Sequence, residues 1–253
     1  MRNLTNVPLL VFAFSLAVLW FSATLAATFG RKLRPLKEEE REDFRIVQAA
    51  ILTLLGLLIG FAFSMALSRY DQRKSYEEAE ANAISTEYER ADLLPAGDAA
   101  RVRDLLRDYL DHRISFYRAR DDRQVERINA STAQLQADLW STVQARSTAS
   151  PTPLIALAVS GMNDVASSQG YTQFSWSNRI PVAAWGLMVA IAIGCNLLIG
   201  YGSRHEGRFL FLLLPLAVAI SFYLIADLDS LRHGLINVEP KSLESLSQSL
   251  SAH

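Results

Sequence analysis

Four long stretches of the sequence lack charged residues and are long enough to cross a bilayer as helices. They cover residues 7–29, 46–68, 180–201 and 209–226. A helix of about 20 apolar residues spans the hydrocarbon core of a membrane, so each stretch predicts one transmembrane helix. The first is longer than the apolar core of a cleavable signal peptide, which favours an uncleaved anchor.

The second apolar stretch continues into a charged segment and meets no proline or glycine until Pro95-Ala96-Gly97. Read as one helix, residues 46–94 would be about 70 Å long at a rise of about 1.5 Å per residue. Further segments with helical apolar spacing follow, and no useful alternating strand pattern occurs. The sequence predicts an all-α integral membrane protein with four transmembrane helices and a helical soluble domain inserted between the second and third.

The same pattern predicts the division of the chain. Residues 1–68 would hold the first two transmembrane helices and a short charged loop, and 69–179 the helical extramembrane domain. Residues 180–226 would hold the last two spans, and 227–253 a C-terminal motif with an amphipathic tail. Both termini and the inserted domain would then share one side of a bacterial inner membrane or plasma membrane. The short loops, 30–45 and 202–208, hold eight Lys or Arg, which only weakly favours a cytoplasmic position for them, so the side stays open.

Composition and charge exclude several classes of function. The 253 residues carry a formal net charge of −1, and the charged middle segment has no basic field for nucleic acid. Arg–carboxylate pairs on helix surfaces are therefore the expected use of its charges. The single cysteine, Cys195, excludes an intrachain disulfide and a cysteine-based zinc site. No hydrolase, metalloprotease or nucleotide-binding motif occurs, so we expect no enzyme, no cofactor and no bound metal.

A stripe of small residues marks the second apolar stretch as a candidate pore or interface. Its members recur at spacings of three and four: Ala49, Thr53, Gly56, Gly60 and Ser64. Such a stripe puts one smooth helix face against a neighbouring helix. The neighbour could belong to the same subunit, which is the simpler interpretation, or the face could meet other subunits or line a pore.

Charged residues near the span ends form a candidate membrane–domain junction: Arg69, Asp71, Arg73, Arg179, Asp227, Asp229 and Arg232. Two carboxylates at a helix C-terminus oppose the helix dipole, so Asp227 and Asp229 need compensation. We expect it from Arg179, Arg232 or an arginine of the inserted domain. The pair would be a solvated or salt-bridged helix end, or a latch that senses an ion or ligand.

Arg69 and Arg73 share one helix face because they lie four residues apart. In an oligomer they could form an arginine ring at a pore mouth that attracts anions. In a monomer they would anchor the helix to lipid headgroups.

Four short motifs mark the chain: Phe63-Ser64-Met65-Ala66, Arg69-Tyr70-Asp71-x-Arg73, Glu78-Ala79-x-Ala81-x-Ala83-Ile84 and Asp227-Leu228-Asp229-x-x-Arg232. Together they resemble the bestrophin-like domain family. The resemblance covers about residues 45–250, with Leu231 where the family more often has proline. It implies a distant relation to bestrophins, which are oligomeric anion channels with a pore lined by the second span.

These observations lead to one main hypothesis and two alternatives. The resemblance predicts a homo-oligomeric anion channel, conducting chloride, whose partners are the lipid bilayer, other copies of the chain and the anion. A non-conducting membrane scaffold or sensor, whose helical domain binds a partner, is the alternative. A membrane enzyme ranks third because no nucleophile, base or metal set presents itself.

Overall fold

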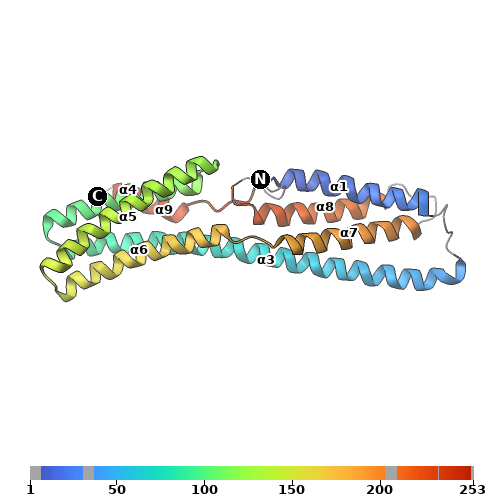
Figure 1. Ribbon diagram of the computed structural model, residues 1–253, viewed down its shortest axis with the longest axis horizontal. Coiled ribbons are helices and arrows are strands. Elements are labelled where there is room, and N and C mark those ends of the chain that lie inside the picture. Colours follow the sequence, from blue (N-terminus) through green and yellow to red (C-terminus); the bar gives the residue numbers. More distant parts are fainter. Residues whose placement is uncertain (1–6, 31–36, 203–209, 233, 252–253) are drawn as a thin grey trace. The chain divides into compact units, whose positions relative to one another are not determined.

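The computed structural model describes residues 7–30, 37–202, 210–232 and 234–251, and all regular secondary structure in these ranges is helical (Figure 1). The all-α prediction is confirmed. Some of the loop charges that bear on the orientation in the membrane lie outside the described residues, namely Arg31, Lys32, Arg34, Arg204 and Arg208. The α-helices are α1 (Pro8–Leu25), α3 (Arg41–Arg90), α4 (Ala96–Arg118), α5 (Asp122–Ala149), α6 (Pro153–Ser177), α7 (Val182–Gly202), α8 (Leu210–Asp229) and α9 (Lys241–Ser251). Three short helices complete them: the π-helix η2 (Ala26–Gly30) and the 3-10 helices η3 (Glu38–Glu40) and η4 (Ala91–Leu93).

Four helical segments are long and apolar enough to cross a membrane, as the sequence predicts. They lie within Pro8–Phe29, Glu38–Leu93, Pro153–Gly202 and Leu212–Asp229. The long second helix is also confirmed, since α3 runs for 50 residues without a break. It begins five residues before the apolar stretch and ends at Arg90, where η4 and then Pro95 stop it.

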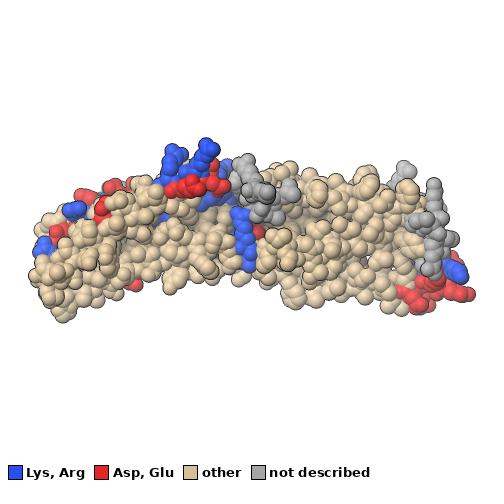
Figure 2. Space-filling model, viewed as in Figure 1, with Lys and Arg blue, Asp and Glu red and all other residues tan. Residues whose placement is uncertain are grey.

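The chain folds into two compact units. The first unit comprises Met1–Arg69 and Arg179–Asn237, and the second comprises Tyr70–Asn178 and Val238–His253. The chain of α3 therefore passes from one unit to the other between Arg69 and Tyr70. Figure 2 shows charged side chains gathered over the second unit and at the start of α3, whereas the visible surface of α1, α7 and α8 consists almost entirely of other residues.

In the first unit, α1 packs against both α7 and α8. Leu19 of α1 is buried there, and between α7 and α8 the rings of Trp185 and Phe222 meet edge to face at 5.8 Å. Gly200 lets α7 approach α1 closely, because a Cβ at this position would lie 2.0 Å from the carbonyl oxygen of Ala23. A helix packed this closely through a small residue gains dispersion contacts along its length.

In the second unit, α4 packs against α5 and α9, and α5 packs against α6. The buried face of α4 follows helical spacing, with Val102, Leu106 and Tyr109 in the core. Helix α6 starts at Pro153, a residue suited to the first helical turn, and the Thr152 hydroxyl accepts a hydrogen bond from the Ile155 N–H at 3.2 Å. Pro153 and Thr152 thus define the start of α6, and α7 is the next helix along the chain.

The contact at Gly200 gives a stability prediction. We expect Gly200→Ala to lower the free energy of unfolding by about 1–3 kcal/mol, because the backbone of Ala23 cannot yield as a flexible side chain would. Thermal unfolding in detergent measures the effect. Gly194→Ala on the same helix is the control, since no described atom lies within 4 Å of its added Cβ. Equal unfolding midpoints for the two variants would contradict the close approach.

Candidate functional site

The small-residue stripe lies on an exposed face of α3. Its five members, Ala49, Thr53, Gly56, Gly60 and Ser64, are all exposed in the single chain. A Cβ added at either glycine would have no described atom within 4 Å. The buried positions of the same segment, such as Leu55, Ala62 and Ala66, lie on another face of the helix. Within the described chain, therefore, the stripe is not packed against a second helix.

The exposed face continues beyond the apolar stretch at the same spacings of three and four. After Ser64 it passes through Leu67, Asp71, Lys74 and Glu78, and all of these are exposed. Small apolar and hydroxyl side chains thus give way to two carboxylates and one ammonium group on one continuous face. Of the predicted junction residues, Asp71 belongs to this face.

Arg69 and Arg73 are turned away from that face. Arg73 is buried in the second unit, and Arg69 of the first unit pairs with Asp229, with 3.6 Å between its Nη1 and Oδ1 of the carboxylate. Both arginines lie at spacings of three and four from buried Ala62 and Ala66 rather than from the stripe. In the single chain, the two side chains therefore belong to the buried side of α3.

The two carboxylates at the end of α8 are buried and compensated inside the first unit. Oδ1 of Asp229 accepts a hydrogen bond from the Ile180 N–H at 3.1 Å, in addition to its ion pair with Arg69. Asp227 accepts hydrogen bonds from the N–H groups of Leu235 at 2.7 Å and Ile236 at 2.9 Å. Backbone dipoles and one arginine thus offset the unfavourable position at a helix C-terminus.

This salt bridge falls within the expectation. Arg69, which pairs with Asp229, is the first residue of the predicted domain 69–179 and so one of the arginines expected beside Arg179 and Arg232. The latter two are partly buried, and the helix end is not solvated. Gly234 allows the chain to fold back over Asp227, since a Cβ there would lie 2.7 Å from the carbonyl oxygen of that aspartate. Of the seven predicted junction residues, Asp71 and Arg73 belong to the second unit and the other five to the first.

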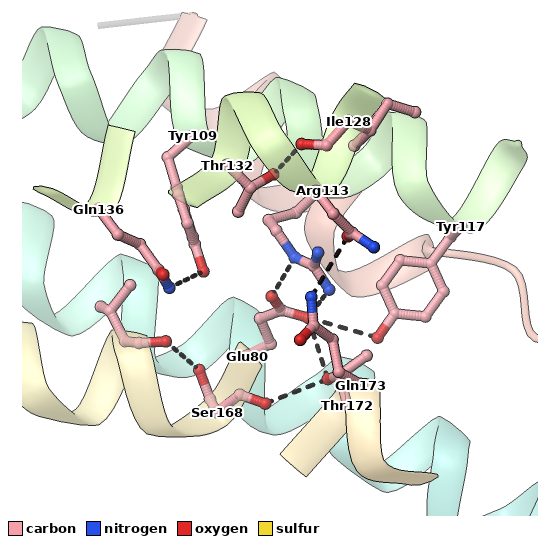
Figure 3. A network of polar contacts seen from close by, with 12 residues as sticks. Glu80, Tyr109, Arg113, Tyr117, Ile128, Thr132, Gln136, Ser168, Thr172 and Gln173 are labelled. Carbon is pink, nitrogen blue, oxygen red and sulfur yellow. Dashed lines mark hydrogen bonds and ion pairs between the residues drawn. The ribbon is translucent and has the colours of Figure 1, made fainter. Parts of the chain in front are cut away.

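A buried polar network in the second unit was not predicted (Figure 3). The carboxylate of Glu80 on α3 is fully buried and pairs with the guanidinium of Arg113 on α4. Tyr117 of α4 donates to the same carboxylate at 3.4 Å, and Thr172 of α6 donates at 3.2 Å. One carboxylate thus joins three helices. The expectation that Arg–carboxylate pairs lie on helix surfaces is wrong for this pair.

The charges of this network are held in place by their neighbours. Burial alone would lower the pKa of Arg113, but the adjacent Glu80 carboxylate keeps it above its ordinary value. Burial, reinforced by the same carboxylate, raises the pKa of Tyr117, so its hydroxyl stays protonated and able to donate. Arg113 and Tyr117 therefore both keep their protons, and the network ties the three helices together.

A second buried carboxylate fixes the C-terminal helix. Oε1 of Glu77 accepts hydrogen bonds from the N–H groups of Ser242 and Leu243, both at 2.9 Å, which satisfies the first turn of α9. Leu243 is buried, and Arg118 of α4 binds Glu244 of α9 at 2.9 Å. The predicted amphipathic tail is thus a helix packed inside the second unit. Among the described residues, no three His, Cys, Asp or Glu side chains gather as metal ligands would.

The buried pair of Glu80 and Arg113 predicts that substitutions at the two residues have non-additive effects on stability. Arg113→Met should lower the free energy of unfolding by about 3–5 kcal/mol, because it leaves the Glu80 charge buried without its partner. The double variant Glu80→Gln with Arg113→Met should lose less free energy of unfolding than Arg113→Met alone, because it carries no buried charge without a partner. Thermal unfolding in detergent compares them, with Arg101→Met at an exposed position of α4 as the control. A double variant less stable than Arg113→Met would rule out the uncompensated charge as the cause.

Comparisons with known proteins agree with the motif resemblance. The Bestrophin-like domain family matches residues 9–243. A crystal structure of a bacterial bestrophin homologue from Klebsiella pneumoniae carrying a single mutation superimposes with a TM-score of 0.71 at 12% identity, covering 95% of this chain and 96% of that one. A second mutant of that homologue gives 0.68 at 13% identity, covering 96% and 99%, and a mutant described as a membrane protein gives 0.69 at 12%, covering 95% and 97%.

These structural likenesses, at such low identity, show the fold alone. No curated protein sequence matches the chain. The family match, in contrast, spans most of the sequence. The chain therefore belongs to the Bestrophin-like domain family and has the bestrophin fold.

Proposed function

We propose that several copies of the chain assemble into an ion channel, with the small-residue face of α3 next to the central axis. The exposure of this face in the single chain carries the proposal. Lipid tails are as apolar as leucine, so helices associate in membranes largely through close packing, which small residues permit. A face of glycine, alanine and hydroxyl side chains makes few contacts with lipid tails. It can pack closely against a neighbouring copy or face a water-filled pore.

The second unit belongs outside the membrane in this proposal. Its helices carry charged surfaces and buried ion pairs, whereas the first unit contains the apolar surfaces of α1, α7 and α8. Charged side chains facing lipid are costly, so water suits the second unit better. With four spans, both ends of the chain would share a side of the membrane with it.

The family relationship predicts an anion, chloride, as the conducted ion. One observation favours a second candidate, a cation. The continued face of α3 exposes Asp71 and Glu78 against one base, Lys74, while Arg69 and Arg73 are turned to the buried side. Rings of Asp or Glu favour cations in pores, and rings of Arg or Lys favour anions. Repeated around an axis, this face would be an acidic ring at one end of the pore.

The first test blocks the proposed pore. Gly60→Trp should reduce ion flux from liposomes at least about tenfold, because its indole would enter the axial space lined by α3. Gly186→Trp on α7 is the matched control: it is also an exposed glycine of a span with no described atom within 4 Å of an added Cβ, and it should leave flux unchanged. Unchanged flux in Gly60→Trp, or no flux in the unaltered protein, would contradict the channel and favour the scaffold alternative.

The second test separates the two ions. In planar bilayers with a KCl gradient, a chloride channel reverses near the chloride potential, whereas the acidic face predicts reversal toward the potassium potential. If that face selects cations, the double variant Asp71→Asn, Glu78→Gln should shift reversal toward chloride by weakening the acidic ring. Glu126→Gln, at a position of α5 away from this face, should not shift it. Reversal at the chloride potential in the unaltered protein would refute the cation candidate.

A further inference from the structure

A third buried glutamate of α3, Glu87, lies directly against α6 in the second unit. Its side chain is fully buried. A Cβ added at Gly161 of α6 would lie 1.8 Å from Oε2 of Glu87 and 2.6 Å from Nη1 of Arg90. The two helices therefore approach each other here across a carboxyl group, which lies directly against the glycine of α6.

This carboxyl group differs from the other two buried glutamates of the same helix. Glu80 has a guanidinium and two hydroxyl donors, and Glu77 has two backbone N–H donors. Neither oxygen of Glu87 has a hydrogen-bond donor among the described residues. A buried ionised carboxylate without donors is costly, whereas the neutral acid is far less so. The geometry thus favours a protonated Glu87.

The charges around Glu87 oppose one another. Burial raises its pKa from 4.5 to about 8; Arg90, one turn further along α3, works against this rise, and Asp164 of α6 adds to it. Nη1 of Arg90 lies 3.7 Å from Oδ2 of Asp164, so its charge is shared with a second carboxylate. Charges of η4, α4 and α5 are paired among themselves: Asp92 binds Arg103 at 2.5 Å, and Asp98 binds Arg146.

We propose that the contact between α3 and α6 at Glu87 and Gly161 is controlled by a proton. The neutral carboxyl group closes the contact, and ionisation of Glu87 loosens it. The closed form holds the proton more tightly than the open form, so closure weakens as pH rises from about 4.5 to about 8 and levels off above that. Acidification therefore tightens the two helices against each other.

Such a contact is placed to act on the membrane segments. Helix α6 leads along the chain into α7, and α3 contains the second apolar stretch. The proton therefore acts on one helix that contains a predicted span and on another that precedes one along the chain. This inference goes beyond the proposed channel, since it concerns the opening of a helix contact and holds whether or not the protein conducts.

Hydrogen–deuterium exchange of the full-length protein in lipid nanodiscs tests the contact directly. Protection factors, which divide out the pH dependence of intrinsic exchange, are measured at pH 5.5 and 7.5. For peptides of α6 around Gly161, protection should fall with rising pH by up to about 100-fold, which is the limit for one linked proton over two pH units. Peptides of α1 and α8, in the first unit, should show no such fall. Equal protection of the α6 peptides at both pH values would overturn the proposal.

Two variants assign the effect to Glu87. Glu87→Gln removes the titration and should make α6 protection the same at both pH values, and Glu87→Leu offers a second neutral side chain should the first fold poorly. Glu89→Gln, at an exposed position two residues along α3, is the matched control and should keep the pH dependence of the unaltered protein. A pH dependence that persists in both Glu87 variants would show that another group is responsible.

Discussion

The fold depends on one helix, α3, which supplies a membrane-length apolar segment to the first unit and a charged segment to the second. Its faces therefore need apolar contacts in one unit and polar partners in the other. Its buried face keeps a spacing of three and four residues throughout but changes in chemistry. In the first unit the face is formed by apolar side chains such as Leu55, Ala62 and Ala66, and in the second it contains Arg73 and three glutamates. Burying a charge is costly, so each of these groups needs partners or loses its charge.

The three glutamates are accommodated in three different ways. Glu80 pairs with Arg113 and accepts hydrogen bonds from two hydroxyl groups, which ties α3 to α4 and α6. Glu77 caps the first turn of α9 and holds the C-terminal helix in the second unit. Glu87 has no donor among the described residues, and its burial favours the neutral form. Glu80 thus ties helices together, Glu77 positions the C-terminal helix, and Glu87 leaves a helix contact open to regulation by protons.

Sequence reasoning succeeds where the signal is local. Uninterrupted apolar runs predict the four candidate spans, the absence of Pro and Gly after Ser68 predicts the continuity of α3, and short motifs predict the family. It fails where partners are distant. Glu80 and Arg113 are 33 residues apart, and no local pattern reveals their pairing. For Asp229 the sequence predicts an arginine of residues 69–179 as one source but not which arginine, and Asp227 relies on backbone N–H groups, which every sequence offers.

One signal for the buried network was nonetheless in the sequence. The helical spacing of Ala62 and Ala66 continues along the chain and predicts which later residues share the buried face of the long helix. These are Arg73, Glu77, Glu80, Ile84 and Glu87. Charge alone suggests a solvated face there, and tertiary packing overrides that suggestion. The same spacing argument sets the small-residue stripe on the opposite, exposed side, where the sequence could not tell packing within one subunit from contact with other copies.

The central claim is that the exposed face of α3 lies at the axis of an assembly of identical chains. Single-particle imaging of the purified protein tests it most directly. We expect a ring of subunits with an axial hole and with α3 as the helix nearest to that hole. A particle that contains one chain, or a ring in which α3 lies at the outer rim, would contradict the account.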